Sequence, residues 1–177
     1  MYTEPRAARL LETMIFAAAR WTLPLSDLNC HMSDETFMLE SFNDVSNRVA
    51  VFEDDGTSAW LYLSGANDRK PIADVWVHNR IGAPPTSEIE NYRGGPPPAA
   101  VGFADDSTIC DEPEAHEWAF LWGGNGNSVV LYRDGTPVAL IEVAGRKGRS
   151  RNLMRDGPWG NMWDDKQYRA ITDNGTQ

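Results

Sequence analysis

The residues best suited to chemistry occupy alternate positions of one predicted strand, from Ile72 to Ile81. Successive side chains of a strand point to opposite faces, so Asp74, Trp76 and His78 are expected on one face. A carboxylate, an aromatic ring and an imidazole that face the same way can line a binding pocket. The alternative is a half-exposed face covered by a helix, in which the histidine is hydrogen-bonded and purely structural.

Two stretches are rich in carboxylates, a residue type that binds metal ions, but the spacing of their residues is not that of a known metal site. Glu53 to Asp55 lie beside a predicted hairpin turn, where carboxylates usually accept bonds from their own backbone. The stretch from Asp111 to Glu117 contains one histidine, but Pro113 interrupts it and the spacing fits neither a calcium loop nor a zinc site. No nucleophile elbow, phosphate loop, dinucleotide fingerprint or zinc-protease motif occurs. We therefore expect no metal, no cofactor and no catalytic residue.

A basic segment follows the last predicted hairpin. Arg146, Arg149 and Arg151 are the candidate anion-binding residues, because guanidinium groups recognise phosphate and carboxylate. The alternative is that these side chains pair with carboxylates of the protein itself, such as those of residues 53–55.

A second candidate surface lies in the stretch 82–114, in which apolar residues do not recur at the spacing of a helix or a strand. It carries a Pro-Pro pair, a Gly-Gly pair and a Pro-Pro-Pro run, and it predicts a long irregular connection. Loops of this length in compact domains are usually functional or disordered. The candidate partner-binding residues, acidic or aromatic, are Glu88, Glu90, Tyr92, Asp105 and Asp106. They suit a basic protein partner. The alternative is a disordered insertion without a role.

Periodicity predicts the elements that would position these residues. Apolar residues at helical spacing predict a helix over 4–21, within an N-terminal segment 1–25. That helix would pack on the domain or form a contact with a partner or a second copy. Alternation and Asp-Gly turns predict strands over 37–42, 48–53, 58–63, 72–81, 114–122, 128–133 and 137–144, and a short helix over 162–171. The predicted fold class is α+β. It consists of one twisted antiparallel sheet of about six or seven strands with an N-terminal and a short C-terminal helix, in a single domain 1–177.

Composition limits the function classes. The 177 residues suit one domain, and the formal net charge of −10 opposes binding to nucleic acid or to anionic membranes. Such a charge favours basic protein partners or simple solubility. The two cysteines, Cys30 and Cys110, are too few for a disulfide framework, and no export signal or membrane span is recognisable. We therefore expect a cytoplasmic protein with reduced thiols.

Several segments together resemble a small bacterial β-rich domain family of unknown function, marked by an FEDDG-type hairpin. The resemblance covers about residues 35–155. It rests on FMLESF (37–42), VFEDDG (51–56), AWLY (59–62), ADVWVH (73–78), WGGNGN (122–127), LYRDGTPVA (131–139) and RKGRSR (146–151). It implies a cytosolic, β-rich module and transfers no activity and no catalytic residue.

The function expected from these features is a non-enzymatic protein-binding module. Its most concrete version is an immunity or antitoxin-like protein that neutralises a basic toxin. One alternative is a small hydrolase, or a nucleotide- or sugar-modifying enzyme, with its site on the Asp74/Trp76/His78 face. The other is a sensor that holds a small anionic ligand with the basic segment.

Overall fold

The computed structural model describes residues 36–92 and 95–173. The helix predicted over 4–21, the contact with a second copy predicted through it, and Cys30 lie outside the described residues.

The first sheet is a four-stranded antiparallel meander. Its strands are β1 (Phe37–Asn43), β2 (Arg48–Asp54), β3 (Ser58–Ser64) and β4 (Pro71–Asn79), paired in chain order. The turn between β2 and β3 forms as predicted. Asp55 Oδ1 accepts bonds from the backbone N–H groups of Thr57 and Ser58 at 2.8 and 2.9 Å, and Gly56 adopts a positive φ of 86°.

The second sheet has five strands, of which the first three form a second meander. They are β5 (Trp118–Trp122), β6 (Ser128–Arg133) and β7 (Thr136–Glu142), followed by the two-residue strands β8 (Arg149–Ser150) and β9 (Asn161–Met162). Asp134 and Gly135 both have positive φ, which is the backbone of a tight hairpin turn. The chain continues into the helix α2 (Asp165–Asp173).

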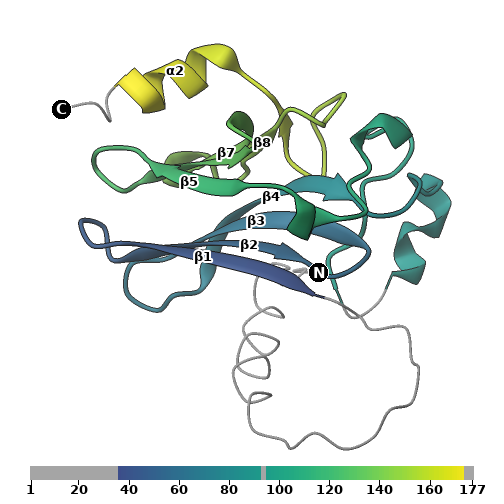
Figure 1. The fold of residues 1–177 in the computed structure, drawn as a ribbon, viewed down its shortest axis with the longest axis horizontal. Coiled ribbons are helices and arrows are strands. Elements are labelled where there is room, and N and C mark those ends of the chain that lie inside the picture. Colours follow the sequence, from purple (N-terminus) through teal and green to yellow (C-terminus); the bar gives the residue numbers. More distant parts are fainter. Residues whose placement is uncertain (1–35, 93–94, 174–177) are drawn as a thin grey trace, which may run out of the picture.

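The two sheets lie face to face, with α2 on the far side of the second sheet (Figure 1). Phe52 and Leu61 of the first sheet and Leu131 and Ile141 of the second belong to the same fully buried core. Ile171 anchors α2 to the outer face of β6 and β7. The core therefore lies between the sheets, with a smaller cluster beneath the helix.

The sheets are joined along the β4 edge. Trp76 N–H donates to Trp159 O at 2.9 Å, and Gly148 N–H donates to Asp74 O at 2.8 Å. Chain segments that lead into and out of β8 and β9 therefore satisfy backbone groups of β4, and this edge is closed.

The predicted α+β fold class, with a single sheet, was wrong. The molecule is mostly β, with two sheets and one short C-terminal helix among the described residues. Alternation shows which residues are extended, but it does not show which strands pair. The long excursion after β4 ends the first sheet, and strands of two residues such as β8 and β9 are too short to show a period.

The described part of the excursion 82–117, residues 82–92 and 95–117, is more ordered than the predicted irregular loop. It contains the 3₁₀ helices η2 (Thr86–Asn91), η3 (Asp106–Thr108) and η4 (Pro113–Ala115). Ala99 is fully buried and exchanges two bonds of 2.9 Å with the side chain of Asn79. These bonds tie described residues of the excursion to β4.

Candidate functional site

A β-bulge in β4 separates the residues predicted to share the Asp74/Trp76/His78 face. Trp76 pairs with Trp60 on β3, and His78 pairs with the preceding β3 residue, Ala59, so one residue of β4 is unpaired. Trp76 stays with Asp74 on the outer face of the first sheet, whereas His78 turns toward the second sheet. The prediction of one shared face was wrong because strict alternation fails at a bulge.

His78 pairs instead with Asp54, one of the three carboxylates of 53–55 that were interpreted from the sequence as turn residues. Its Nε2 lies 2.9 Å from Asp54 Oδ2, and neither side chain is exposed to solvent. Arg80 Nη1 lies 3.7 Å from Asp54 Oδ1. The rings of Phe52 and Trp118 lie about the imidazole, with centroids 6.0 and 5.9 Å away. Asp54 could have been recognised from its position, since it alternates with the apolar residues 50 and 52.

The protonation states of this buried cluster do not suit nucleophilic catalysis. Burial lowers the pKa of His78, although the bond to Asp54 opposes the shift, so the imidazole is neutral. Burial also raises the pKa of the nearby Cys110 thiol, against the opposing effect of Arg133. A reactive thiol needs a lowered pKa and access to substrate. The pKa directions of His78 and Cys110 therefore give no support to an activated nucleophile in this cluster.

The outer face of the first sheet carries a different polar group, here termed the acidic hairpin face: Glu53, Asp55, Tyr62 and Asp74. Tyr62 and Asp74 are cross-strand partners. The Tyr62 hydroxyl is buried and has no hydrogen-bond partner within the described part of the chain. Burial raises the pKa of Tyr62 strongly, and the charges of Glu53, Asp74 and Asp55 raise it further. The phenol is therefore a protonated, unused donor among three carboxyl groups.

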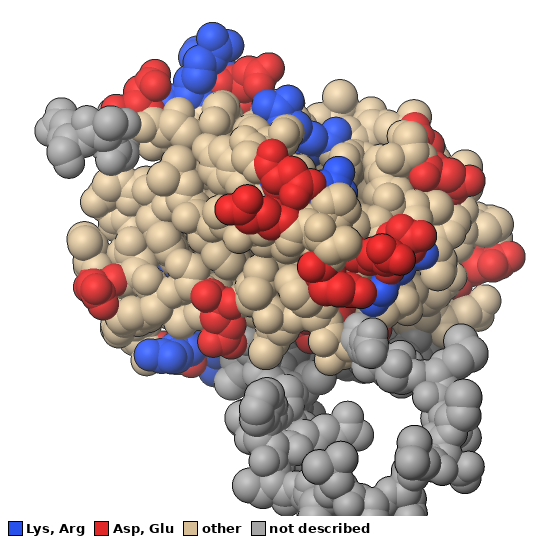
Figure 2. Space-filling view, viewed as in Figure 1, with Lys and Arg blue, Asp and Glu red and all other residues tan. Residues whose placement is uncertain are grey.

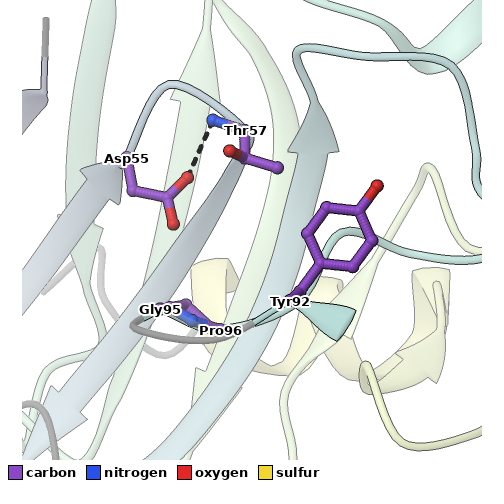
Figure 3. A pocket seen from close by; sticks show the side chains of 5 residues that line it. All are labelled: Asp55, Thr57, Tyr92, Gly95 and Pro96. Atoms are coloured by element: carbon purple, nitrogen blue, oxygen red, sulfur yellow. Dashed lines mark hydrogen bonds between the residues drawn. The ribbon is translucent and has the colours of Figure 1, made fainter. Parts of the chain in front are cut away.

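A small pocket of about 60 Å³ opens beside this face (Figure 3). Its lining consists of Asp55, Thr57, Tyr92, Gly95 and Pro96. Figure 3 shows Asp55 and Thr57 on the hairpin and Tyr92 across the pocket from them. Burial raises the pKa of Asp55, while the backbone bonds from residues 57 and 58 oppose the shift. The fold thus brings Tyr92, one residue of the predicted partner-binding set, to the same pocket as Asp55 of the first turn.

The remaining members of that set lie on the surface of the excursion. Glu88 and Glu90 are exposed on η2, while Asp105 and Asp106 are exposed at the start of η3. Asp106 Oδ1 accepts the backbone N–H of Ala83 at 3.2 Å, and Asp105 accepts that of Ser107 at 2.8 Å. These last two carboxylates therefore also hold the chain in place.

The acidic surface is wider than the sequence-based set. The excursion exposes eight carboxylates: Glu88, Glu90, Asp105, Asp106, Asp111, Glu112, Glu114 and Glu117. None of them lies within 4.0 Å of a cationic side chain of another described residue. Between Arg80 and Arg133 the sequence contains a single Lys or Arg, Arg93. Figure 2 shows acidic side chains spread over the side of the molecule on which the 3₁₀ helices lie.

The basic segment is largely engaged within the molecule. Arg149 Nη1 donates to Met162 O at 2.8 Å. Arg151 lies 3.3 Å from Asp165 Oδ1, and its guanidinium lies 4.2 Å from the centroid of the Trp163 ring. Both side chains fasten α2 and the strand before it to the second sheet, and neither contacts the carboxylates of 53–55 considered from the sequence.

Arg146 differs from these two arginines. It is exposed, adopts a left-handed backbone with φ of 55°, and makes no hydrogen bond or ion pair to another described residue. The three candidate anion-binding residues therefore do not converge on one site, and the structure gives no geometric support to the anion-sensor alternative.

An open groove of about 460 Å³ was not anticipated from the sequence. The turn 123–128, residues 142–144 and the end of α2 line it, and Glu142 is the one charged side chain among the described lining residues. Gln167 of α2 donates to Glu142 and accepts from Arg149. The Gly-rich turn is the sequence signal for the groove, because small residues leave space between the second sheet and the helix.

Comparison with known proteins found no matching family model, no similar curated protein and no similar solved structure. These results leave the resemblance to the FEDDG-hairpin family untested. Over residues 36–92 and 95–173, no helix combines the length and apolar character needed to cross a membrane. In the same ranges no cluster of three or more His, Cys, Asp or Glu side chains has the arrangement of a metal site.

Proposed function

We propose that this protein is a non-enzymatic binding module whose acidic excursion, residues 82–117, binds a basic protein partner. The observation that carries the proposal is the set of eight exposed carboxylates on the excursion, none of which lies within 4.0 Å of a cationic side chain of another described residue. Its most concrete form is an immunity or antitoxin-like protein that neutralises a basic toxin in the cytoplasm. A resident of that compartment would keep its thiols reduced, and Cys110 is a free, buried thiol.

The charge distribution supports this role. Unpaired like charges repel each other and lower the stability of a fold, so a surface that keeps them favours a ligand of opposite charge. Carboxylates of this kind accelerate encounter with a basic protein, often by 10-fold or more at low salt. The affinity itself requires desolvated anchors, and Tyr92 at the end of η2 is the aromatic side chain positioned for that purpose.

The order of the excursion also supports it. Ala99 is fixed to Asn79, and Val101 N–H donates to Pro84 O at 2.9 Å. A segment already held in one conformation loses less entropy on binding than a flexible one. The described residues around Ala99 and Val101 are therefore suited to bind with little loss of conformational entropy.

The test compares two variants with equal changes in charge. The surface variant carries Glu88→Gln, Glu90→Gln, Glu112→Gln and Glu114→Gln, and leaves the capping residues Asp105 and Asp106 intact. The control variant carries Glu40→Gln, Asp44→Asn, Asp68→Asn and Asp173→Asn, which are exposed outside the excursion. Each immobilised protein is used to capture partners from the native cytosol, and the association rate of the captured protein is then measured.

The expected result is a basic protein captured by the wild type and the control, with an association rate about 10-fold slower for the surface variant. If the captured protein is an inhibitor of growth, co-expression with the wild type should restore growth, and co-expression with the surface variant should do so less well. Equal association rates for the two variants, or capture of an acidic protein only, would contradict the proposal.

A further inference from the structure

The two sheets are joined along the β4 edge, but on the opposite side β1 and β5 are edge strands. Each of them pairs with one strand only among the described residues. Trp122 Nε1 donates to Ser41 Oγ at 2.9 Å, so the two edge strands lie on the same side of the sandwich. The inward side chains of both strands are only partly buried, whereas Phe52 of β2 and Leu131 of β6 are fully buried. This side of the core is therefore incompletely covered by the described residues.

The hydrogen-bond pattern of β5 shows which of its backbone groups face the open edge. Gly123 N–H donates to Ser128 O at 3.0 Å, and Asp134 N–H donates to Glu117 O at 2.8 Å. In an antiparallel pair, hydrogen-bonded positions alternate with positions that are not hydrogen-bonded. Residues 117, 119, 121 and 123 therefore bond β6, and the N–H and C=O groups of residues 118, 120 and 122 point away from it. No described strand pairs with these outward groups.

The β5 edge also lacks the features that usually prevent strand pairing. Charged residues, proline and bulges protect most exposed edges. Residues Trp118–Trp122 contain no charge and no proline, and their register with β6 has no shift. Leu121 is 41% exposed on the outer face, and the aromatic rings of the inner face are only partly buried. A row of free backbone groups between two apolar surfaces fits an extended chain, which can add as a further strand.

The surroundings of β5 indicate the charge of that chain. Glu117 directly precedes the strand, is exposed, and lies more than 4.0 Å from every cationic side chain of the other described residues. Glu112 and Glu114 lie a few residues earlier, whereas two glycines follow the strand. A second copy of this chain would bring no positive charge to Glu117 and would oppose one net charge of −10 with another. A partner with a basic residue at one end of its strand is therefore favoured.

We propose that β5 binds an extended segment of the basic partner as an additional antiparallel strand of the second sheet. Apolar side chains of that segment would pack beside Phe120 and Trp122, and a lysine or arginine at its carboxyl-terminal end would lie opposite Glu117. Main-chain bonds would supply affinity, and the basic residue would set the direction and register of the segment. The inference rests on the proposed function, because the acidic excursion leads directly into β5 and both surfaces would contact the same partner.

Amide hydrogen exchange of the full-length protein tests whether the edge is free. The N–H groups of residues 118, 120 and 122 should exchange rapidly, whereas those of Ala119 and Leu121 should be protected by β6. Protection of all five amides at low protein concentration would show that another part of this chain covers the edge. Protection that rises together with the mass in solution would assign the edge to a second copy. Either result would overturn the proposal.

Short peptides serve as probes in place of the unidentified partner. The parent probe is acetyl-Thr-Val-Thr-Val-Thr-Val-Lys amide. One comparison peptide has glutamate in place of the lysine, and the other carries an N-methyl group on its central valine, which removes a donor to β5. We expect saturable binding of the parent with protection of amides 118, 120 and 122, and about 10-fold weaker binding of both comparison peptides. Equal binding of the N-methylated peptide would exclude strand addition, and equal binding of the glutamate peptide would contradict a basic partner.

The matched variants are Phe120→Pro and Phe120→Val. Both remove the aromatic ring, but only the proline removes the outward N–H, which β6 does not use and which an edge strand can lose. The valine variant should bind the parent peptide about 10-fold more tightly than the proline variant. Equal affinities of the two variants, each shown to be folded by its thermal unfolding, would refute the proposal. If Phe120→Pro does not fold, the N-methylated peptide tests the same hydrogen bond on the wild type.

Failure of this inference can be told apart from failure of the proposed function. The four-residue surface variant leaves β5 and Glu117 unchanged, so it should bind the parent peptide with nearly wild-type affinity while associating slowly with the captured partner. Phe120→Pro should instead associate at the wild-type rate and release the partner faster than Phe120→Val does. Equal release by these two variants would show that the excursion binds the partner without β5, and only the inference drawn here would fail.

Discussion

At the scale of single residues, the polar groups of this protein fall into two classes. Asp54 Oδ2 and His78 Nε2 bond each other inside the sandwich, where an ionised histidine would be costly, while His78 Nδ1 has no partner within the described residues. Tyr62, on the outer face, keeps a buried hydroxyl without a partner in the described chain. The first class stabilises the fold only while its protonation state is maintained, and the second contributes no hydrogen bond to stability. Both classes lead to stability predictions.

Acid should destabilise the protein through His78. Because the pKa of His78 is lowered in the folded state, only the unfolded chain takes up this proton as the pH falls below 6.5. The free energy of unfolding should therefore decrease from that pH down to the folded-state pKa, with a slope of at most about 1.4 kcal/mol per pH unit.

The contribution of His78 to the pH dependence of stability can be measured by comparing the wild type with a variant that lacks the imidazole. His78→Gln, whose amide can still donate to Asp54, should show a flatter pH dependence of the free energy of unfolding in urea. His116→Gln is the control, because His116 lies at the surface 2.7 Å from Asp134. An unchanged slope in His78→Gln between pH 5 and 7 would show that the buried imidazole is not responsible.

Removal of the Tyr62 hydroxyl should cost nothing. Tyr62→Phe should leave the free energy of unfolding unchanged or raise it by up to about 1 kcal/mol, since an unpaired buried donor is lost. Tyr132→Phe is the comparison, because its hydroxyl lies 2.9 Å from that of Tyr168 and its loss should cost about 1 kcal/mol. Chemical denaturation measures both. Equal destabilisation by the two substitutions would mean that the Tyr62 hydroxyl has a partner after all.

At the scale of elements, the junction between the two sheets is a point of close backbone packing. A Cβ atom added to Gly148 would lie 2.6 Å from Leu140 O and 2.8 Å from Val75 Cβ. Contacts this short require the neighbouring atoms to move. Gly148 also bonds β4 through its N–H and receives the N–H of Asn161 at 2.9 Å on its carbonyl. The glycine allows three backbone segments to meet, and it thereby closes the β4 edge.

A single methyl group should disturb this junction. Gly148→Ala should lower the free energy of unfolding by about 1–3 kcal/mol through overpacking. Gly145→Ala is the control, because no atom lies within 4 Å of its added Cβ, and its effect should stay within about 0.5 kcal/mol. Thermal and urea unfolding of the two variants provide the comparison. A neutral Gly148→Ala would indicate that the sheets separate easily along this edge.

At the scale of the whole molecule, charge is distributed unevenly. The acidic excursion carries eight exposed carboxylates, whereas residues 146–155 and α2 hold a large share of the cations. Arg149 and Arg151 use their charges internally, so the basic end is partly neutralised while the acidic side is not. The molecule therefore presents one strongly negative side to its surroundings.

This asymmetry should make stability depend on salt. Screening of the unpaired carboxylates should raise the midpoint of thermal unfolding between 0.02 and 0.5 M NaCl, because the Debye length falls from about 20 Å to a few ångströms. The four-residue surface variant should be more stable than the wild type at low salt and should respond less to added salt. The control variant should resemble the wild type more closely, since Asp68, one of its sites, lies within 3.9 Å of Lys70. Identical salt responses of all three proteins would contradict a concentrated negative surface.

The sequence by itself determined the local structure of most of the chain. Alternation located seven strands to within a few residues, and the Asp-Gly pairs located two tight turns, because side-chain period and turn chemistry are properties of neighbouring residues. It also determined the charge and the acidic residues of the excursion. The tertiary structure alone decided that the strands divide into two sheets, since pairing depends on contacts between distant segments. It also placed His78 with Asp54 and Asp55 with Tyr92. The first placement required an unpaired residue that interrupts alternation, and the second required a 3₁₀ helix far along the chain to return to the first turn.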